Sequence, residues 1–82
     1  MVTVKFFGLI RIDTGVSEMQ AEGNTIKEIL TDISRKNPDL TVKDLKRKII
    51  FLNGVDITEL KIFRTKVEKG DEITIMSPVS GG

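Results

Sequence analysis

The sequence contains no cysteine, histidine, tryptophan or tyrosine. Without cysteine, the chain cannot form a disulfide bond or supply thiolate ligands to zinc or to an iron–sulfur cluster. Without histidine, it lacks the side chain that most often transfers protons in catalysis near neutral pH. The Ser, Asp, Glu and Lys residues that remain show no spacing that would activate one of them as a nucleophile. We therefore expect a protein that is not itself an enzyme and that binds neither a metal nor a cofactor.

The sequence also lacks the features that direct a chain to a membrane or to nucleic acid. It has no long apolar run and no signal-peptide pattern. Its 13 Lys and Arg residues nearly balance its 12 Asp and Glu residues, so the formal net charge is +1. Such a balance gives no general attraction to nucleic acid or to an anionic membrane. With 82 residues, of which 39% are hydrophobic, the composition predicts one globular domain. We expect this domain to be cytoplasmic and to be a monomer when free.

The first patterned segment, residues 2–7, alternates apolar and polar side chains, which is typical of a strand. The residues predicted to face the core are Val2, Val4 and Phe6. Phe7 falls on the other face, although it would also be buried if it lay under the following loop. Residues 8–15 are predicted to be a connection, and residues 16–22 a strand that returns beside the first.

Residues 25–37 carry the clearest helix pattern. Thr25 and Glu28 match a capping box, in which the threonine caps the start of the helix and the glutamate reaches back to an unpaired amide. Apolar residues then recur at helical spacing along one stripe, formed by Ile26, Ile29, Leu30 and Ile33. Pro38 ends the helix, because the residue before a proline disfavours the helical conformation. The pattern predicts a helix with one buried face.

Residues 38–48 are predicted to be a polar connection. Its apolar anchors are Leu40, Val42 and Leu45. Four cations also gather in it, Lys43, Lys46, Arg47 and Lys48. We interpret these cations as a solvated face, and the alternative is a docking patch for an acidic partner.

Three more strands are predicted in the second half of the chain. Residues 49–52 form a continuous apolar run, which indicates a central strand buried on both faces. Asn53-Gly54 is a strong hairpin signal, so residues 55–57 are predicted to be a short return strand. Residues 73–76 alternate again and form the last predicted strand.

One helix with a single apolar stripe needs one sheet to cover it, so the order of elements predicts a two-layer α+β domain. We place this domain at residues 1–76 and a flexible C-terminal tail at residues 77–82. The tail ends in Gly81 and Gly82, which have no Cβ atom and can enter a narrow channel. Pro78 favours an extended exit from the domain. The tail is therefore predicted to present the carboxylate of Gly82 to the active site of another enzyme.

Several short motifs in a fixed order resemble the MoaD/ThiS family of ubiquitin-like sulfur carriers. They are Lys5-Phe6-Phe7-Gly8, Arg11, Gly15, Asn53-Gly54, Gly70-Asp71-Glu72-Ile73 and Pro78-Val79-Ser80-Gly81-Gly82. The length, Phe6-Phe7 and Ser77-Pro78-Val79 are more similar to MoaD proteins, the small subunits of molybdopterin synthase, than to ThiS proteins. The resemblance implies a β-grasp fold, in which a mixed sheet of four to five strands packs on one main helix.

The resemblance also implies a function for the tail. The carboxylate of Gly82 would be adenylated by a ubiquitin-activating-type enzyme, which must hold the ATP because this chain has no phosphate-binding glycine loop. The adenylate would become a thiocarboxylate, whose sulfur enters molybdopterin during molybdenum or tungsten cofactor biosynthesis. The second implied partner is the large subunit of molybdopterin synthase. The residues expected to bind partners are Phe7, Arg11, Leu60, Met76, Pro78 and Val79.

Two positions depart from the family pattern and leave alternatives open. Ser77 stands where MoaD proteins often carry a proline, and Ile12 where they often carry an acidic residue. Neither position touches the chemistry of the tail, but both bear on the identity of the partner. Besides the molybdopterin pathway, the chain fits a sulfur carrier for thiamine or tRNA thiolation. It also fits a ubiquitin-like modifier joined through Gly82 to lysines of target proteins, or an interaction module without tail chemistry.

Overall fold

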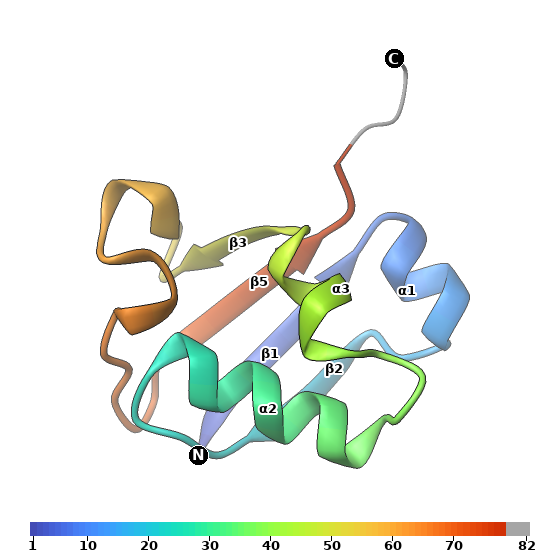
Figure 1. The fold of residues 1–82 in the computed structure, drawn as a ribbon, viewed down its shortest axis with the longest axis horizontal. Helices are drawn as coiled ribbons and strands as arrows, with labels where there is room; N and C mark the ends of the chain where they lie inside the picture. The colour runs from blue at the N-terminus through green and yellow to red at the C-terminus, as the bar shows by residue number, and fades with distance from the viewer. Residues whose placement is uncertain (79–82) are drawn as a thin grey trace.

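The computed structural model describes residues 1–78, and within them a five-stranded sheet is covered on one face by a main helix (Figure 1). The strands are β1 (Val2–Phe7), β2 (Glu18–Ala21), β3 (Ile49–Leu52), β4 (Val55–Asp56) and β5 (Glu72–Met76). They lie in the order β2-β1-β5-β3-β4. The β1 and β5 strands run parallel, and the other neighbouring pairs are antiparallel. The predicted two-layer α+β architecture is confirmed, and the first and last strands lie side by side.

The main helix, α2 (Ile26–Lys36), begins as its sequence predicts. The Thr25 hydroxyl accepts a hydrogen bond from the N–H of Glu28, with 3.2 Å between nitrogen and oxygen. The Glu28 carboxylate in turn accepts a hydrogen bond from the N–H of Asn24 at 2.9 Å, one residue earlier than in an ordinary capping box. The helix ends just before Pro38, as predicted.

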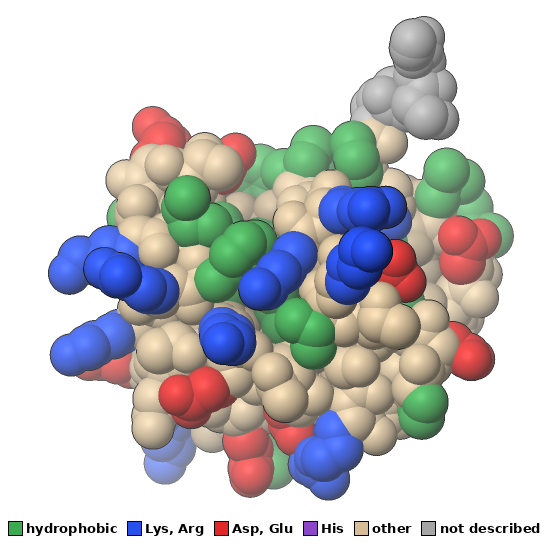
Figure 2. Space-filling view, in the orientation of Figure 1, with side chains coloured by type: hydrophobic (Ala, Val, Ile, Leu, Met, Phe, Trp, Pro, Cys, Tyr) green, Lys and Arg blue, Asp and Glu red, His purple; other side chains and the backbone are tan. Residues whose placement is uncertain are grey.

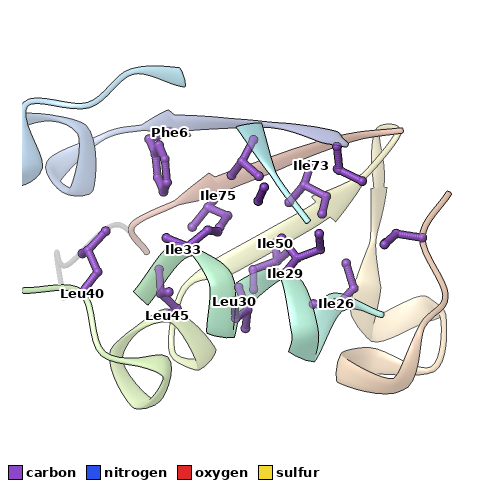
Figure 3. Close-up of a cluster of buried hydrophobic side chains, with 14 of the residues drawn as sticks. Phe6, Ile26, Ile29, Leu30, Ile33, Leu40, Leu45, Ile50, Ile73 and Ile75 are labelled. Carbon is purple, nitrogen blue, oxygen red and sulfur yellow. The ribbon is translucent and has the colours of Figure 1, made fainter. Parts of the chain in front are cut away.

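The hydrophobic core lies between the sheet and α2 (Figure 3). The predicted apolar stripe of the helix is fully buried and consists of Ile26, Ile29, Leu30 and Ile33. It faces inward-pointing side chains from three adjacent strands, which include Phe6, Ile50, Ile73 and Ile75. Full burial of a side chain of this size contributes about 1.5–3 kcal/mol to stability. This apolar layer is what holds the helix on the sheet.

The predicted hairpin joins β3 to β4. Asn53 and Gly54 both have positive φ angles, 49° and 85°, as the tight turn of a two-residue hairpin requires. The Asn53 side chain also accepts a hydrogen bond from the N–H of Glu72 at 2.9 Å and donates one to the Asp71 carboxylate at 3.1 Å. The turn is thus tied to the start of β5.

The structure corrects the predicted connection at residues 8–15, because most of it is a short helix, α1 (Leu9–Thr14). Ile10 turns inward and is buried in the core. The chain reaches the helix through Gly8, whose φ of 77° is strained for residues with a Cβ atom. A helix of six residues with one buried apolar side chain shows too little periodicity to be seen in a sequence.

The predicted connection at residues 38–48 also contains a helix, α3 (Val42–Lys46). Thr41 caps it by accepting a hydrogen bond from the N–H of Asp44 at 3.1 Å. Leu45 is fully buried and is an anchor as predicted. The missed signal was the threonine followed three residues later by an acid, which is typical of a helix start.

The prediction of a strand buried on both faces at residues 49–52 is wrong for β3. Ile50 and Leu52 pair with Ile75 and Ile73 on the core side. Ile49 and Phe51 therefore lie on the opposite face, where they are only half-buried. Two 3-10 helices, η1 (Ile57–Glu59) and η2 (Ile62–Arg64), follow β4, so Ile57, predicted to end the return strand, instead begins η1.

Candidate docking surface and tail root

The face of the sheet opposite α2 carries an apolar patch at one end. Phe7 of β1 pairs with Met76 of β5, and Met76 pairs with Ile49 of β3. These three side chains therefore project from one face in a row across three strands. Phe51, two residues beyond Ile49 on β3, lies on the same face in the next row, opposite Thr74 of β5. We call Phe7, Ile49, Phe51 and Met76 the open-face patch.

Phe7 is the most exposed aromatic side chain of the patch. It is 43% exposed, whereas its neighbour Phe6, on the core face, is 1% exposed. The alternative in which Phe7 is buried under residues 8–15 is therefore excluded. Met76 is half-buried. The structure brings together Phe7 and Met76, two of the residues expected to bind partners.

The other end of the open face is polar. Lys5 forms a salt bridge with Glu72, with 3.2 Å between nitrogen and oxygen. Thr3 accepts a hydrogen bond from the side chain of Gln20 at 2.9 Å. Because β1 and β5 run parallel, the apolar end is the end at which β5 finishes and the chain continues to Ser77. The open-face patch thus lies at the root of the tail.

The remaining predicted partner residues are distributed more widely. Leu60 is 41% exposed and follows β4, an edge strand two places from β5, so its membership in the patch stays a prediction. Arg11 is exposed on α1. Pro78 is exposed at the end of the described chain. The other predicted tail residues, Val79, Gly81 and Gly82, lie outside the described residues.

Three further apolar residues, Ile49, Leu9 and Ile12, are at least partly exposed but were not among the predicted partner residues. Ile49 was assigned to a doubly buried strand, and only its pairing with Met76 places it on the open face. Leu9 and Ile12 of α1 are 54% and 75% exposed. For Ile12 the sequence did contain a signal, because this apolar residue stands where MoaD proteins often carry an acidic one. Exposed apolar side chains near one another often mark interaction surfaces.

A further contact ties the tail root to α1. The N–H of Ile10 donates a hydrogen bond to the Ser77 hydroxyl at 2.9 Å, across 67 residues of sequence. Gly8, which precedes the helix, packs against the same serine, and a Cβ atom there would lie 3.6 Å from the Ser77 nitrogen. The start of α1 and the start of the tail are therefore in direct contact.

The basic cluster lies on the other side of the molecule, over α3. Figure 2 shows Lys and Arg side chains across the helix-bearing face, interspersed with neutral surface. Lys46 lies with its ammonium 5.1 Å from the centre of the Phe63 ring, a cation–π distance. Among residues 1–78, no ion pair joins this cluster to an acid. Lys43, Lys46 and Arg47 are exposed and Lys48 is half-buried, and both the solvated face and the docking patch for an acidic partner stay predictions.

Among residues 1–78, Asp32 of α2 is the buried acidic residue. It accepts hydrogen bonds from the N–H of Glu22 at 2.9 Å and from Arg35 at 2.6 Å, and it lies 3.0 Å from the Lys36 ammonium. Chiefly the Glu22 amide, and then the two cations, lower the pKa of Asp32 from 3.8 to about 2, although burial acts in the opposite direction. The carboxylate joins the residue after β2 to α2, so its role is to stabilise the fold.

The described part of the chain also has open hollows on its surface. A hollow of about 400 Å³ lies between α1, the end of α2 and α3, and its charged lining residues are Asp13, Lys36, Asp39, Asp44 and Lys48. Residues 1–78 contain no group of three potential metal ligands. None of the described helices combines the length and the apolar character needed to cross a membrane.

A mixed sheet that packs on one main helix, with its first and last strands parallel and adjacent, is the arrangement of the β-grasp, ubiquitin-like fold. Solved structures agree. Small archaeal modifier protein 1 from Methanosarcina acetivorans matches with a TM-score of 0.85 and 29% identity, covering 99% of this chain and 95% of the other. A chain of the BexX/CysO complex from Amycolatopsis orientalis matches with a TM-score of 0.79 and 26% identity over 100% of both chains.

A third similar structure is a protein–protein complex of subunits 1 and 2 of molybdopterin-converting factor from Helicobacter pylori. One of its chains matches with a TM-score of 0.67 and 28% identity, covering 99% of this chain and 97% of the other. The ThiS family model matches residues 4–82. The chain therefore belongs to the ThiS family, and the resemblance found in the sequence is confirmed. No curated protein sequence matches the chain significantly.

Proposed function

We propose that this protein is a sulfur carrier of molybdopterin biosynthesis, whose Gly82 carboxylate is adenylated and converted to a thiocarboxylate. The observation that carries the proposal is that the family match extends through Gly81 and Gly82. The similar Helicobacter pylori chain, from a complex of molybdopterin-converting factor subunits, supports the choice of pathway. The protein acts as a carrier for two partners, an activating enzyme and the large subunit of the synthase.

The proposed chemistry follows from the reactivity of a carboxylate. A carboxylate is a poor electrophile because its negative charge repels nucleophiles. Attack of one carboxylate oxygen on the α-phosphorus of ATP expels pyrophosphate and leaves an acyl-adenylate. Sulfide supplied by the partner system then attacks the carbonyl carbon and displaces AMP, so that the net change at Gly82 is one oxygen replaced by one sulfur. The glycine residues leave the carbonyl carbon open to approach from either side.

The open-face patch supplies the proposed docking surface. Apolar patches rimmed by polar residues are typical of protein interfaces, and this patch has the Lys5–Glu72 ion pair at its polar edge. Its position at the end of β5 means that a partner bound to Phe7 and Met76 also lies next to the tail root. Docking and delivery of the tail would therefore involve one side of the molecule.

A second candidate function is that of a protein modifier, joined through Gly82 to lysine side chains. The observation that favours it is the similarity to small archaeal modifier protein 1 over nearly the whole chain. Both functions begin with the same acyl-adenylate, and they differ in whether sulfur or a lysine amine displaces AMP. The product therefore distinguishes them.

The test is incubation with the activating enzyme of the source organism, ATP and a sulfur source, followed by intact mass measurement. The expected product has one oxygen exchanged for sulfur at Gly82. Adducts on lysines of other proteins, without a thiocarboxylate pool that feeds molybdopterin synthase, would favour the modifier instead. Two control chains, one lacking Gly82 and one with an extra residue after it, should remain folded but should not be activated. Normal adenylation of the chain that lacks Gly82 would refute both functions.

A further inference from the structure

The start of α1 depends on a residue from the other end of the chain. The first N–H groups of a helix have no partner within the helix and need a cap. At α1 the capping position is Gly8, which has no side chain to offer. The Ser77 hydroxyl fills this role, because it accepts a hydrogen bond from the N–H of Ile10 at 2.9 Å. Ile10 itself is buried, so loss of the hydroxyl would leave its amide without this partner.

The same contact lies at the point where the tail leaves the sheet. The pairing of β5 with β1 ends at Phe7 and Met76, and its pairing with β3 ends at Ile49 and Met76. Beyond Met76, strand pairing no longer constrains the chain. Ser77 is the next residue, and it remains half-buried against Gly8 and α1. Its side chain therefore fixes the chain one residue further than the sheet can.

We propose that Ser77 is a positioning residue that sets the direction in which the tail leaves the domain. The inference rests on the proposed function, because it assumes that the tail must reach the active site of a partner docked on the open-face patch. With Ser77 bonded to α1, the tail starts from a fixed point beside that patch. Without this bond, the docked complex would spend more time with the tail misdirected. Orienting a reacting group before the reaction raises the rate, because less entropy is then lost on the way to the transition state.

A purely structural role for Ser77 would predict something different. In that case the hydroxyl would only stabilise α1, and any equal weakening of α1 would have the same consequences. The chain offers a matched control at the other end of this helix. The Thr14 hydroxyl donates a hydrogen bond to the carbonyl oxygen of Ile10 at 2.7 Å and accepts one from the N–H of Val16 at 3.1 Å. Thr14→Ala therefore weakens α1 without touching the tail root.

The first experiment needs no partner. The sequence has no cysteine, so Ser80→Cys introduces a single site for a nitroxide spin label. Paramagnetic broadening of backbone amide signals then maps the surface that the label visits. In the chain that keeps both Ser77 and Thr14, and in Thr14→Ala, the label should broaden the same limited set of amide signals. In Ser77→Ala, the broadening should spread over a different, wider set of amides. An unchanged broadening pattern in Ser77→Ala would overturn the proposal, whatever the function of the tail.

The second experiment measures adenylation by ATP–pyrophosphate exchange with the unlabelled variants. Ser77→Ala should lower kcat about fivefold, the kinetic equivalent of one ordinary hydrogen bond of ~1 kcal/mol. Its KM should be unchanged, because the open-face patch is intact. Ser77→Thr, which keeps the hydroxyl, should restore kcat, and Thr14→Ala should keep it. Equal losses in Ser77→Ala and Thr14→Ala would overturn the positioning role. If the parent chain itself is not adenylated, the proposed function fails, and the spin-label result still decides the role of Ser77.

Discussion

The two faces of the sheet are made by the same strands but differ in almost every physical property. Phe6 and Phe7 are adjacent residues of β1, yet the first is buried under α2 and the second is exposed. On the covered face, isoleucines and Phe6 close against the helix (Figure 3). On the open face, Phe7, Met76 and Ile49 lie at the end near the tail and Phe51 lies in the next row, whereas β1 and β5 are polar toward the other end. One face therefore supplies stability, and the other leaves a local surface free for a partner.

The comparison also shows how a small domain separates the two tasks. In a strand, successive side chains point to opposite faces, so a change at one position need not disturb its neighbour. The covered face contributes through the area that it removes from water. Phe7 is 43% exposed and contributes less to folding than a buried side chain of its size, whereas Ile49, Phe51 and Met76 are half-buried and still contribute. Substitutions on the covered face should therefore reduce stability, and substitution of Phe7 on the open face should reduce partner binding more than stability.

The largest effect is expected from a charge at the centre of the covered face. Ile29→Asp should unfold the domain, because an unpaired carboxylate on a fully buried residue costs an amount comparable to the whole stability of a domain, about 5–15 kcal/mol. Lys27→Asp is the control, since Lys27 is exposed on the same helix. Circular dichroism and thermal melting measure both. Similar melting temperatures for the two variants would mean that the covered face is not the source of stability.

The next effect separates the two faces within one strand. Phe6→Ser should cost about 3–5 kcal/mol of stability or more, as large truncations in a core do. Phe7→Ser should cost only about 1–2 kcal/mol, since nearly half of the side chain is exposed already. Affinity of Phe7→Ser for the activating enzyme or the large synthase subunit should instead fall by about 2 kcal/mol, the scale of an interface hot spot.

Denaturant unfolding measures the stability of Phe6→Ser and Phe7→Ser, and a binding titration measures their affinity for the two partners. The comparison of faces fails if Phe7→Ser is destabilised as strongly as Phe6→Ser. The docking proposal fails separately if Phe7→Ser keeps its fold and binds both partners with unchanged affinity.

The smallest effect concerns the carboxylate that fastens α2 over the covered face. The pKa of Asp32 is lowered in the folded state, so ionised Asp32 stabilises the fold above its unfolded-state pKa near 3.8. That contribution is lost as the pH falls toward the folded-state pKa of about 2. Asp32→Asn should therefore destabilise the domain at pH 7 by on the order of 2 kcal/mol.

The pH dependence supplies the check on this prediction. The stability difference between the parent and Asp32→Asn should shrink between about pH 4 and pH 2, since both chains then carry a neutral side chain at position 32. Subtracting the curve of unfolding free energy against pH for Asp32→Asn from that of the parent removes the contribution of the other carboxylates. Urea unfolding at a series of pH values measures this stability difference. A difference that stays constant down to pH 2 would show that the Asp32 charge does not stabilise the fold.

Much of the architecture could be predicted because it rests on local patterns. The capping residues and apolar stripe of α2 lie within a dozen residues, and all of the stripe is buried as predicted. The hairpin at Asn53 and Gly54 is set by backbone conformations that few other residue pairs adopt. By contrast, α1 and α3 are too short to show a full apolar period, and each is held mainly by one buried side chain, Ile10 or Leu45.

The candidate site could be predicted only in part. The alternation of β1 and of β5 separately places Phe7 and Met76 away from the core, but their adjacency depends on the pairing of the two strands. The continuous apolar run of β3 conceals which of its residues face outward, because alternation is the only signal of facing and Ile49 and Phe51 do not show it.

The sequence by itself determined the main helix, the tight hairpin and the inward face of the first and last strands, because the interactions behind them join residues close along the chain. Only the tertiary structure decided that Phe7, Met76 and Ile49 form one row, and that Ser77 caps a helix 67 residues away. These contacts have no local signature. They exist because burial of one apolar core brings the two ends of the chain together.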